Sequence, residues 1–164
     1  MIRPATPADW NQITALYAAA RDFMCATGNP RQWGTTHPPL SQLEEDIPAG
    51  HLFVCEEEGQ LLGVFAFILG IDPTYIEIEG GSWLNDQPYG TIHRICGDNV
   101  TKGVFGKCLD YCLTKTDNVR IDTHEDNKIM QHVLEKHGFQ RCGIIYVFDG
   151  TPRLAYHLAK STQK

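Results

Sequence analysis

The chain has 164 residues, of which 42% are hydrophobic and 21% are charged, and its formal net charge at pH 7 is −6. This composition is typical of a soluble globular protein, and the length suits one domain with a substantial core better than two. We therefore predict a single domain over residues 1–160, followed by a short polar tail at 161–164. The negative charge argues against nucleic acid as the main partner.

The apolar segments and the cysteines predict a cytoplasmic protein that does not associate with membranes. The longest apolar run, LLGVFAFILGI at 61–71, is too short to span a bilayer, and the N-terminal MIRPATPADW contains no apolar signal segment. The six cysteines show no CxxC pair and no zinc-ligand spacing, so we expect reduced thiols and no metal site.

Charge is unevenly distributed along the chain. Between Arg31 and Arg94 there are ten acidic residues and no Lys or Arg, whereas from Arg94 onward eleven basic residues face eight acidic ones. The middle segment would attract a cation, and the C-terminal part could tolerate a polyanion. A chance distribution over a solvated surface is the alternative explanation.

The N-terminal half predicts a strand at 2–6 and then a long helix, which Thr6, Pro7 and Asp9 mark as a helix start and which continues to Phe23 at helical apolar spacing. A short second helix is expected at 41–47. Residues 51–70 predict two strands joined by a tight turn at Glu58 and Gly59. Residues 72–90, rich in Gly, Pro and Asp, predict a loop that could include a strand at 75–79.

The C-terminal half alternates between strands and helices. We predict strands at 91–97, 119–124, 139–148 and 153–158, and helices at 103–115 and 127–138. Together the segments predict an α/β or α+β fold, in which a mixed sheet of about six to seven strands is flanked by about four helices.

The turn GDNVTKGVFGKC at 97–108 joins a predicted strand to a predicted helix. The unpaired amides of a helix start attract anions, Gly103 and Gly106 would let a phosphate approach the backbone, and Lys102 adds a positive charge. The turn matches neither GxxxxGK[ST] nor GxGxxG, which argues against a nucleoside-triphosphate loop and against a dinucleotide fold. An ordinary strand–helix turn is the alternative.

The segment EDNKIMQHVLEKHGFQRCGIIY at 125–146 resembles the N-x-x-A…Y-E-K-x-G-F pattern of the GNAT superfamily of acetyltransferases. The order of predicted elements is similar over essentially the whole chain, and TIHRICG, RIDTHEDN and EKHGFQRCGIIYV are similar to one bacterial branch. The resemblance implies a GNAT-like sheet, acetyl-CoA (coenzyme A) as cofactor, and acetyl transfer to a primary amine by direct attack on the thioester.

The acceptor implied by this resemblance is a small-molecule or amino-acid-like amine. A catalytically weak acyl-CoA-binding or regulatory module of the same fold is the alternative function. The sequence leaves a homodimer open.

The resemblance also implies which residues hold the cofactor. In this family, amides of the loop bind the pyrophosphate and the preceding strand pairs with the pantetheine arm, which a helix-start Asn also contacts. By position, these residues are Lys102, Gly103, Val104, Phe105 and Gly106 in the loop, Ile95, Cys96 and Gly97 in the strand, and Asn127 at the helix start.

The sequence departs from the family pattern at three positions. Val100 stands where the loop usually has Arg or Gln, and Phe105 stands where a second small residue is usual. Leu134 occupies the helix position that often carries a Tyr acid, and leucine cannot protonate a leaving thiolate. We therefore expect cofactor binding with altered affinity.

His93 is the first candidate for the general base that the reaction needs. It lies on the predicted cofactor strand, at a position matching a catalytic His in some arylalkylamine acetyltransferases, and imidazole titrates near pH ~6.5. Alternation predicts that His93 shares a face with Thr91 and Ile95. A hydrogen-bonded structural His beside Arg94 is the alternative.

Other side chains are further candidates. His124 and Glu79 could serve as the base, Glu79 could also bind a cationic substrate, and Tyr146 could replace the missing acid. Trp33 and Trp83 could line the acceptor site by stacking against an amine. For each of them, a capping, solvated-loop or packing role is the alternative. The family's oxyanion donor, a strand N–H, is expected around Gly97.

Overall fold

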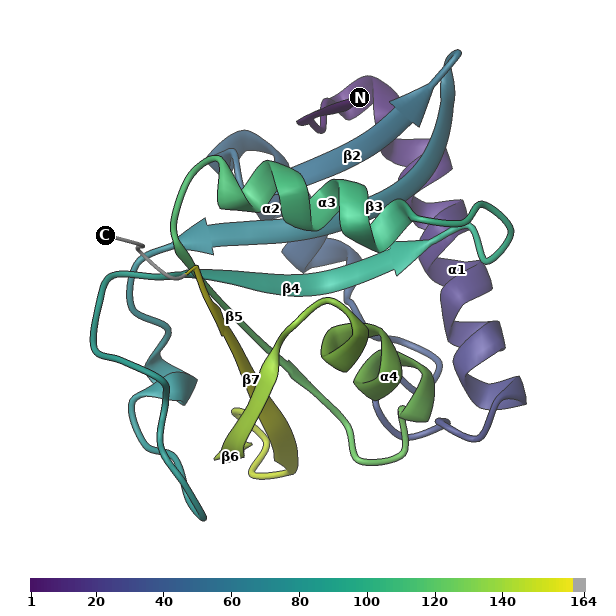
Figure 1. Ribbon diagram of the computed structural model, residues 1–164. Helices are drawn as coiled ribbons and strands as arrows, with labels where there is room; N and C mark the ends of the chain where they lie inside the picture. Colours follow the sequence, from purple (N-terminus) through teal and green to yellow (C-terminus); the bar gives the residue numbers. More distant parts are fainter. Residues whose placement is uncertain (161–164) are drawn as a thin grey trace.

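The computed structural model describes residues 1–160, and the predicted polar tail at 161–164 lies outside this range. Seven strands form one mixed sheet in the order β1-β2-β3-β4-β5-β7-β6 (Figure 1). Neighbouring strands are antiparallel except for β4 and β5, which are parallel. With four α-helices, this confirms the predicted fold class.

The predicted elements agree with the structure to within a few residues. The helices are α1 (Trp10–Ala26), α2 (Leu40–Ala49), α3 (Val104–Leu113) and α4 (Lys128–Lys136), with short 3-10 helices η1 (Pro7–Asp9) and η2 (Pro73–Tyr75). The strands are β1 (Ile2–Pro4), β2 (Leu52–Glu57), β3 (Gln60–Leu69), β4 (Gly90–Gly97), β5 (Asn118–Thr123), β6 (Gln140–Tyr146) and β7 (Pro152–Ala159).

The strand expected at 75–79 is wrong. Asp72 caps a 3-10 turn there by accepting a hydrogen bond from the Thr74 amide, and of this segment only Glu79 forms a bridge, with Ile144 of β6. A Pro that follows a capping Asp favours this turn over an extended chain.

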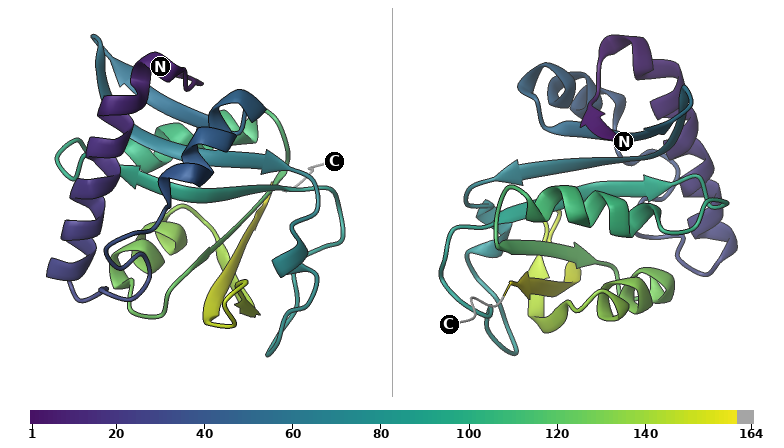
Figure 2. Two further views of the ribbon diagram at one scale, coloured as in Figure 1. Left: turned by 180° about the vertical axis from the view of Figure 1, so that it is seen from behind. Right: turned by 45° about the horizontal axis from the view of Figure 1, so that its top comes forward.

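The sheet separates two layers of helices. α3 and α4 cover one face, whereas α1 and α2 cover the other, as the reversed view shows (Figure 2). Successive side chains of β3 enter the two cores in turn, as strand geometry requires. Phe65 and Phe67 pack beneath α3, and Val64 and Ala66 pack beneath α1 and α2.

β4 and β5 diverge along their length (Figure 1). They pair only at Gly90 with Val119 and at Thr91 with Arg120, although β4 stays paired with β3 as far as Gly97. Beyond Thr91, the edge of β4 that faces β5 therefore has no strand partner within residues 1–160. This edge leads directly into the loop that precedes α3.

A β-bulge at Arg94 accompanies this divergence. The pairing with β3 shifts there, and Arg94 has a φ of 52°, a conformation that costs a residue with a side chain roughly 1–3 kcal/mol. Two helices hold it in place: the Tyr17 hydroxyl donates to the Arg94 carbonyl at 2.7 Å, and the guanidinium lies 2.8 Å from Asp46 of α2.

The bulge also reverses the side-chain alternation of β4. Ile92 and Ile95 both contact the core beneath α3, whereas Cys96 packs against the core beneath α1 and α2. The expectation that Ile95 shares a face with His93 and Thr91 is therefore wrong, because a single extra residue inverts the pattern.

Replacing Asp46 with Asn should destabilise the fold. Its side chain is 2% exposed and that of Arg94 is 14% exposed, so the variant leaves a largely buried guanidinium without its countercharge. We expect the free energy of unfolding, measured with urea at pH 7, to fall by about 3 kcal/mol.

The matched control is Glu45→Gln, which removes an exposed carboxylate from the adjacent position of α2. It should change the free energy of unfolding by less than about 0.5 kcal/mol. Equal effects of the two substitutions would contradict the role given to Asp46.

Candidate active site

His93 lies immediately before the bulge, and its neighbour across the ladder is Ala66, in the core beneath α1 and α2. The Nε2 atom of its imidazole is 2.8 Å from Oδ2 of Asp72, in the loop that follows β3. Sequence reasoning missed Asp72. Its signal, an Asp before Pro-Thr, predicts a local turn and gives no indication of a partner 21 residues away.

A second carboxylate joins this group from β5. The Tyr75 hydroxyl donates to Oδ2 of Asp122 at 2.6 Å, and the Tyr75 ring lies 6.3 Å from the imidazole of His93 between ring centroids. We call His93, Asp72, Tyr75 and Asp122 the His93 cluster. It brings together side chains of β4, β5 and the η2 turn on the sheet face opposite to α3.

The two acids of the His93 cluster have pKa values shifted in opposite directions. Burial works to raise the pKa of Asp72, but hydrogen bonds from His93 and Thr74 outweigh it and lower the pKa to about 2. Burial raises the pKa of Asp122, against the opposing effects of the Tyr75 hydrogen bond and of nearby His93 and Arg153. Asp72 is thus a carboxylate at neutral pH, and Asp122 gains a proton more readily.

The loop between β4 and α3 presents free backbone amides. α3 begins at Val104 after Gly103, whose φ of 81° suits glycine, and no side chain within residues 1–160 caps this helix start. The Asp98 carboxylate accepts hydrogen bonds from the amides of Val100 at 3.0 Å and Thr101 at 2.8 Å. The amides of the first turn of α3 are therefore better placed for an anion than those earlier in the loop.

Three of the predicted loop residues, Val104, Phe105 and Gly106, belong to this first turn of α3. The Phe105 ring packs 5.2 Å from His137 and 6.3 Å from Phe139 between ring centroids, so the unusual aromatic residue fills space beside α4. A Cβ at Gly106 would lie 3.3 Å from Nε2 of His137. A larger residue at 106 would therefore have to displace this imidazole slightly.

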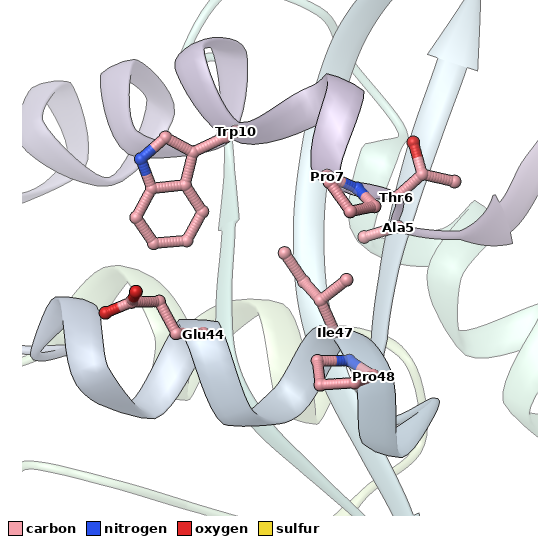
Figure 3. A pocket seen from close by; sticks show the side chains of 7 residues that line it. All are labelled: Ala5, Thr6, Pro7, Trp10, Glu44, Ile47 and Pro48. Carbon is pink, nitrogen blue, oxygen red and sulfur yellow. The ribbon is translucent and has the colours of Figure 1, made fainter.

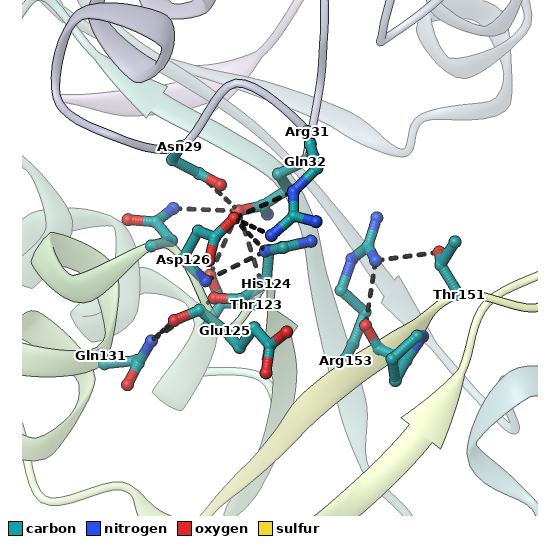
Figure 4. A network of polar contacts seen from close by, with 12 residues as sticks. Asn29, Arg31, Gln32, Thr123, His124, Glu125, Asp126, Gln131, Thr151 and Arg153 are labelled. Atoms are coloured by element: carbon teal, nitrogen blue, oxygen red, sulfur yellow. Dashed lines mark hydrogen bonds and ion pairs between the residues drawn. The ribbon is translucent and has the colours of Figure 1, made fainter.

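The turn between β5 and α4 is bound to the segment that follows α1 (Figure 4). Arg31 pairs with Asp126 at 2.6 Å, and Oε1 of Gln32 accepts a hydrogen bond from Nδ2 of Asn127 at 3.0 Å. Asn127 also caps α4 by accepting from the Met130 amide at 3.0 Å. Both ends of the Asn127 amide are thus engaged within the chain.

His124 belongs to this same turn. Its Nδ1 atom accepts a hydrogen bond from the Asp126 amide at 3.0 Å, and burial lowers its pKa. This environment favours a neutral imidazole that stabilises the turn. The structure therefore places His124 with Asp126 and Gln32, and none of its hydrogen bonds reaches the His93 cluster.

Glu79 and Tyr146 form a pair that joins the loop after β3 to the end of β6. The Tyr146 hydroxyl donates to Oε1 of Glu79 at 2.9 Å, and the hydrogen bond to this carboxylate raises the pKa of Tyr146. Both side chains are solvent-accessible at this contact. The structure brings these two candidates together and shows no hydrogen bond between them and His93.

The two candidate tryptophans are held by packing. Trp33 is 7% exposed and lies edge-on to Tyr17 at 5.6 Å between ring centroids. The indole of Trp83 donates to the Tyr75 carbonyl at 2.9 Å, and the Arg120 guanidinium lies 4.2 Å from its ring centroid. Trp83 thus contacts the backbone of the His93 cluster, whereas Trp33 stabilises the side of the bulge that Tyr17 supports.

A hollow of about 550 Å³ lies away from these groups, between the start of α1 and α2 (Figure 3). The hollow is lined by Ala5, Thr6, Pro7, Trp10, Glu44, Ile47 and Pro48. Glu44 is the one charged residue of this lining, and none of the lining residues belongs to the His93 cluster. Within residues 1–160, no group of three or more His, Cys, Asp or Glu residues is placed to hold a metal ion. No helix in the same range is long and apolar enough to cross a membrane.

Because the pKa of Asp122 is raised in the folded state, its carboxyl should lower the free energy of unfolding by an amount that depends on pH. A carboxyl whose pKa is higher in the folded state costs nothing below its unfolded pKa of about 3.9, and costs more as pH rises through the folded value. Asp122→Asn retains an acceptor for Tyr75 and removes the charge. Relative to wild type, its free energy of unfolding should therefore increase as pH rises above about 4, and the difference should become constant once the carboxyl is ionised in the folded state as well.

Urea unfolding at several pH values measures this trend. Asp110→Asn, at an exposed position of α3, is the control and should show a difference from wild type that varies little with pH. A relative stability of Asp122→Asn that falls as pH rises would contradict the burial argument.

Comparison with solved structures finds matches over nearly the whole chain. An acetyltransferase of the GNAT family from Streptococcus agalactiae is 35% identical, with a TM-score of 0.88, over 99% of this chain and 96% of that one. One of the GNAT family from Listeria monocytogenes is 19% identical, with a TM-score of 0.70, over 97% and 94% of the two chains. An N-acetyltransferase from Staphylococcus aureus is 22% identical, with a TM-score of 0.62, over 98% of each chain.

The sequence identity to the first of these proteins is high enough to indicate family membership, whereas the lower identities to the other two show a shared fold alone. Neither a protein-family model nor a curated protein matches the chain.

Proposed function

Because the chain belongs to the GNAT family of acetyltransferases, we propose that it transfers the acetyl group of acetyl-CoA to the primary amine of a small-molecule or amino-acid-like acceptor. The observation that carries this proposal is the position of the His93 cluster where β4 leaves β5. At this point of β4, the titratable side chain of His93 lies next to the edge of the strand that has no partner.

Acetyl-CoA fits the hydrogen-bonding groups of β4 and the following loop. The uncapped amides of α3 suit a pyrophosphate, and the unpaired edge of β4 suits the amides of a pantetheine arm. Asp98 opposes this fit, because its carboxylate occupies two loop amides and adds a negative charge. We assign the pyrophosphate to Lys102, Gly103, Val104, Phe105 and Gly106, and the pantetheine to Ile95, Cys96, Gly97 and Asn127.

Bound acetyl-CoA supplies an activated acyl carbon, and the chain supplies the groups that act on the acceptor. His93 takes a proton from the ammonium form or from the attacking amine, and a backbone N–H near Gly97 stabilises the developing oxyanion. Glu79, Trp33 and Trp83 are assigned to the acceptor side, Tyr146 is assigned to the protonation of the leaving thiolate, and His124 is assigned to the support of the β5–α4 turn.

The protonation of the leaving thiolate has no donor at the usual family position. Leu134 is a residue of α4 whose side chain is fully buried in the core, where it contributes packing. The missing donor favours the second candidate function, a module that binds acyl-CoA and transfers slowly. The two functions differ in turnover and share cofactor binding.

Thiol release over a panel of primary amines tests the proposed function. With acetyl-CoA present, we expect an amine-dependent release of free thiol that His93→Ala reduces on the order of 10²-fold or more. His132→Ala, at an exposed position of α4, is the control and should retain the rate. Binding of acetyl-CoA by calorimetry without thiol release for any amine would favour the slow module, and absence of binding would overturn the cofactor.

Val100→Arg should strengthen cofactor binding. Val100 is 83% exposed beside the start of α3, so a guanidinium there can reach a phosphate without loss of packing. We expect the dissociation constant of coenzyme A, measured by calorimetry, to fall about threefold to tenfold. Val100→Leu is the control for side-chain size, and equal affinities of the two variants would place the phosphates elsewhere.

A further inference from the structure

The hydrogen bond between His93 and Asp72 determines which imidazole nitrogen is free. Asp72 has a pKa of about 2, so near neutral pH its carboxylate only accepts hydrogen bonds. At 2.8 Å from Oδ2, Nε2 of His93 must therefore carry the proton. In the neutral imidazole the lone pair then lies on Nδ1.

Nδ1 of His93 is accessible. It has no hydrogen-bond partner within residues 1–160, and it is not among the buried polar atoms that lack one. The His93 side chain is 23% exposed. A general base needs an accessible nitrogen with a free lone pair, because a nitrogen that already accepts a hydrogen bond cannot take a proton from the acceptor substrate.

The Asp72 carboxylate is itself fixed. Its Oδ1 atom accepts from the amide and the hydroxyl of Thr74 at 2.8 and 2.6 Å, which leaves Oδ2 to face His93. The Asp72 amide donates to the Tyr89 hydroxyl at 2.8 Å. Tyr75, which follows Thr74 in the same turn, packs its ring against the imidazole of His93. One short turn thus supplies the hydrogen bond and the contact that orient the ring.

We propose that Asp72 is the positioning residue of this site: it holds His93 in the Nε2–H tautomer, presents Nδ1 to the acceptor and stabilises the imidazolium. This inference rests on the proposed function. As the amine nitrogen forms its bond to the acyl carbon, its N–H bond breaks and the proton passes to Nδ1. The C–S bond breaks and its electron pair leaves with the sulfur.

The charged and titratable groups around His93 come from several elements. Asp72 and Tyr75 lie in the η2 turn, Asp122 lies on β5, and Arg94 follows on β4 with its charge paired to Asp46. Arg153 of β7 acts on Asp122. Among these groups, Asp72 alone makes a hydrogen bond to the imidazole, so its removal should have the largest effect on the protonation of His93.

The tautomer can be read without any substrate. In protein labelled with ¹⁵N-histidine, two-dimensional NMR of the neutral imidazole at alkaline pH should show the Nε2–H form in wild type and a shift toward Nδ1–H in Asp72→Asn, whose amide can donate to Nε2. The control is Asp86→Asn, an exposed acid of the same loop, which should leave the wild-type tautomer. Nδ1–H in the wild type would overturn the inference.

Kinetics then separates positioning from stability. Asp72→Asn should lower kcat on the order of 10²-fold with the KM for acetyl-CoA nearly unchanged, and the acid limb of the pH profile should move to lower pH because the imidazolium loses its countercharge. Asp72→Glu should recover part of kcat. An unchanged pH profile in Asp72→Asn would contradict the inference.

A second variant keeps the test valid if Asp72→Asn does not fold. Thr74→Val retains the Asp72 charge but removes the hydroxyl that orients it, and it should give a mixture of both tautomers. Nε2–H in the wild type without thiol release for any amine would reject the proposed function and retain the pair. Thiol release with the same tautomer in wild type and in both variants would reject the role of Asp72 alone.

Discussion

The Arg94 carbonyl accepts a hydrogen bond from Tyr17 of α1, and the Arg94 guanidinium pairs with Asp46 of α2, so two helices hold one strained residue of β4. Without these contacts, a left-handed backbone at an arginine would relax to extended strand. The bulge is thus maintained by the core beneath α1 and α2. It directs His93 and Ile95 to opposite faces of the sheet, close to where β4 leaves β5.

Electrostatics on the His93 face depends on the same geometry. Asp72 and Asp122 lie near one imidazole, yet the first is stabilised as an anion by three hydrogen bonds, whereas the second has Tyr75 as its only donor within residues 1–160. Burial therefore prevails at Asp122 and hydrogen bonding at Asp72. This asymmetry gives the site one permanent negative charge and one acid that can change its protonation state.

The sequence predicted the parts of the fold that local physics decides. Apolar periodicity indicates α1, β2, β3 and α3, and the glycine-containing turn before α3 indicates a helix start with free amides. The bulge at Arg94 escaped detection because its strain is balanced by Tyr17 and Asp46, which are distant in sequence. The Asp72–His93 and Glu79–Tyr146 pairs were missed for the same reason. The false strand at 75–79 arose from alternation in a segment that a proline turn controls.

The polar loops that flank β4 and follow β5 have one feature in common: a side chain of the loop itself accepts hydrogen bonds from amides that the turn exposes. Asp72 binds Thr74, Asp98 binds Val100 and Thr101, and Asn127 binds Met130. A loop organised in this way does not need a ligand to adopt its shape, so less ordering entropy is lost on binding. The arrangement also restricts where a ligand can bind, because only the polar groups that the loop has not already hydrogen-bonded are available to it. At Asp98 this restricts an anion to the first turn of α3, and at Asp72 it leaves one carboxylate oxygen for one imidazole nitrogen.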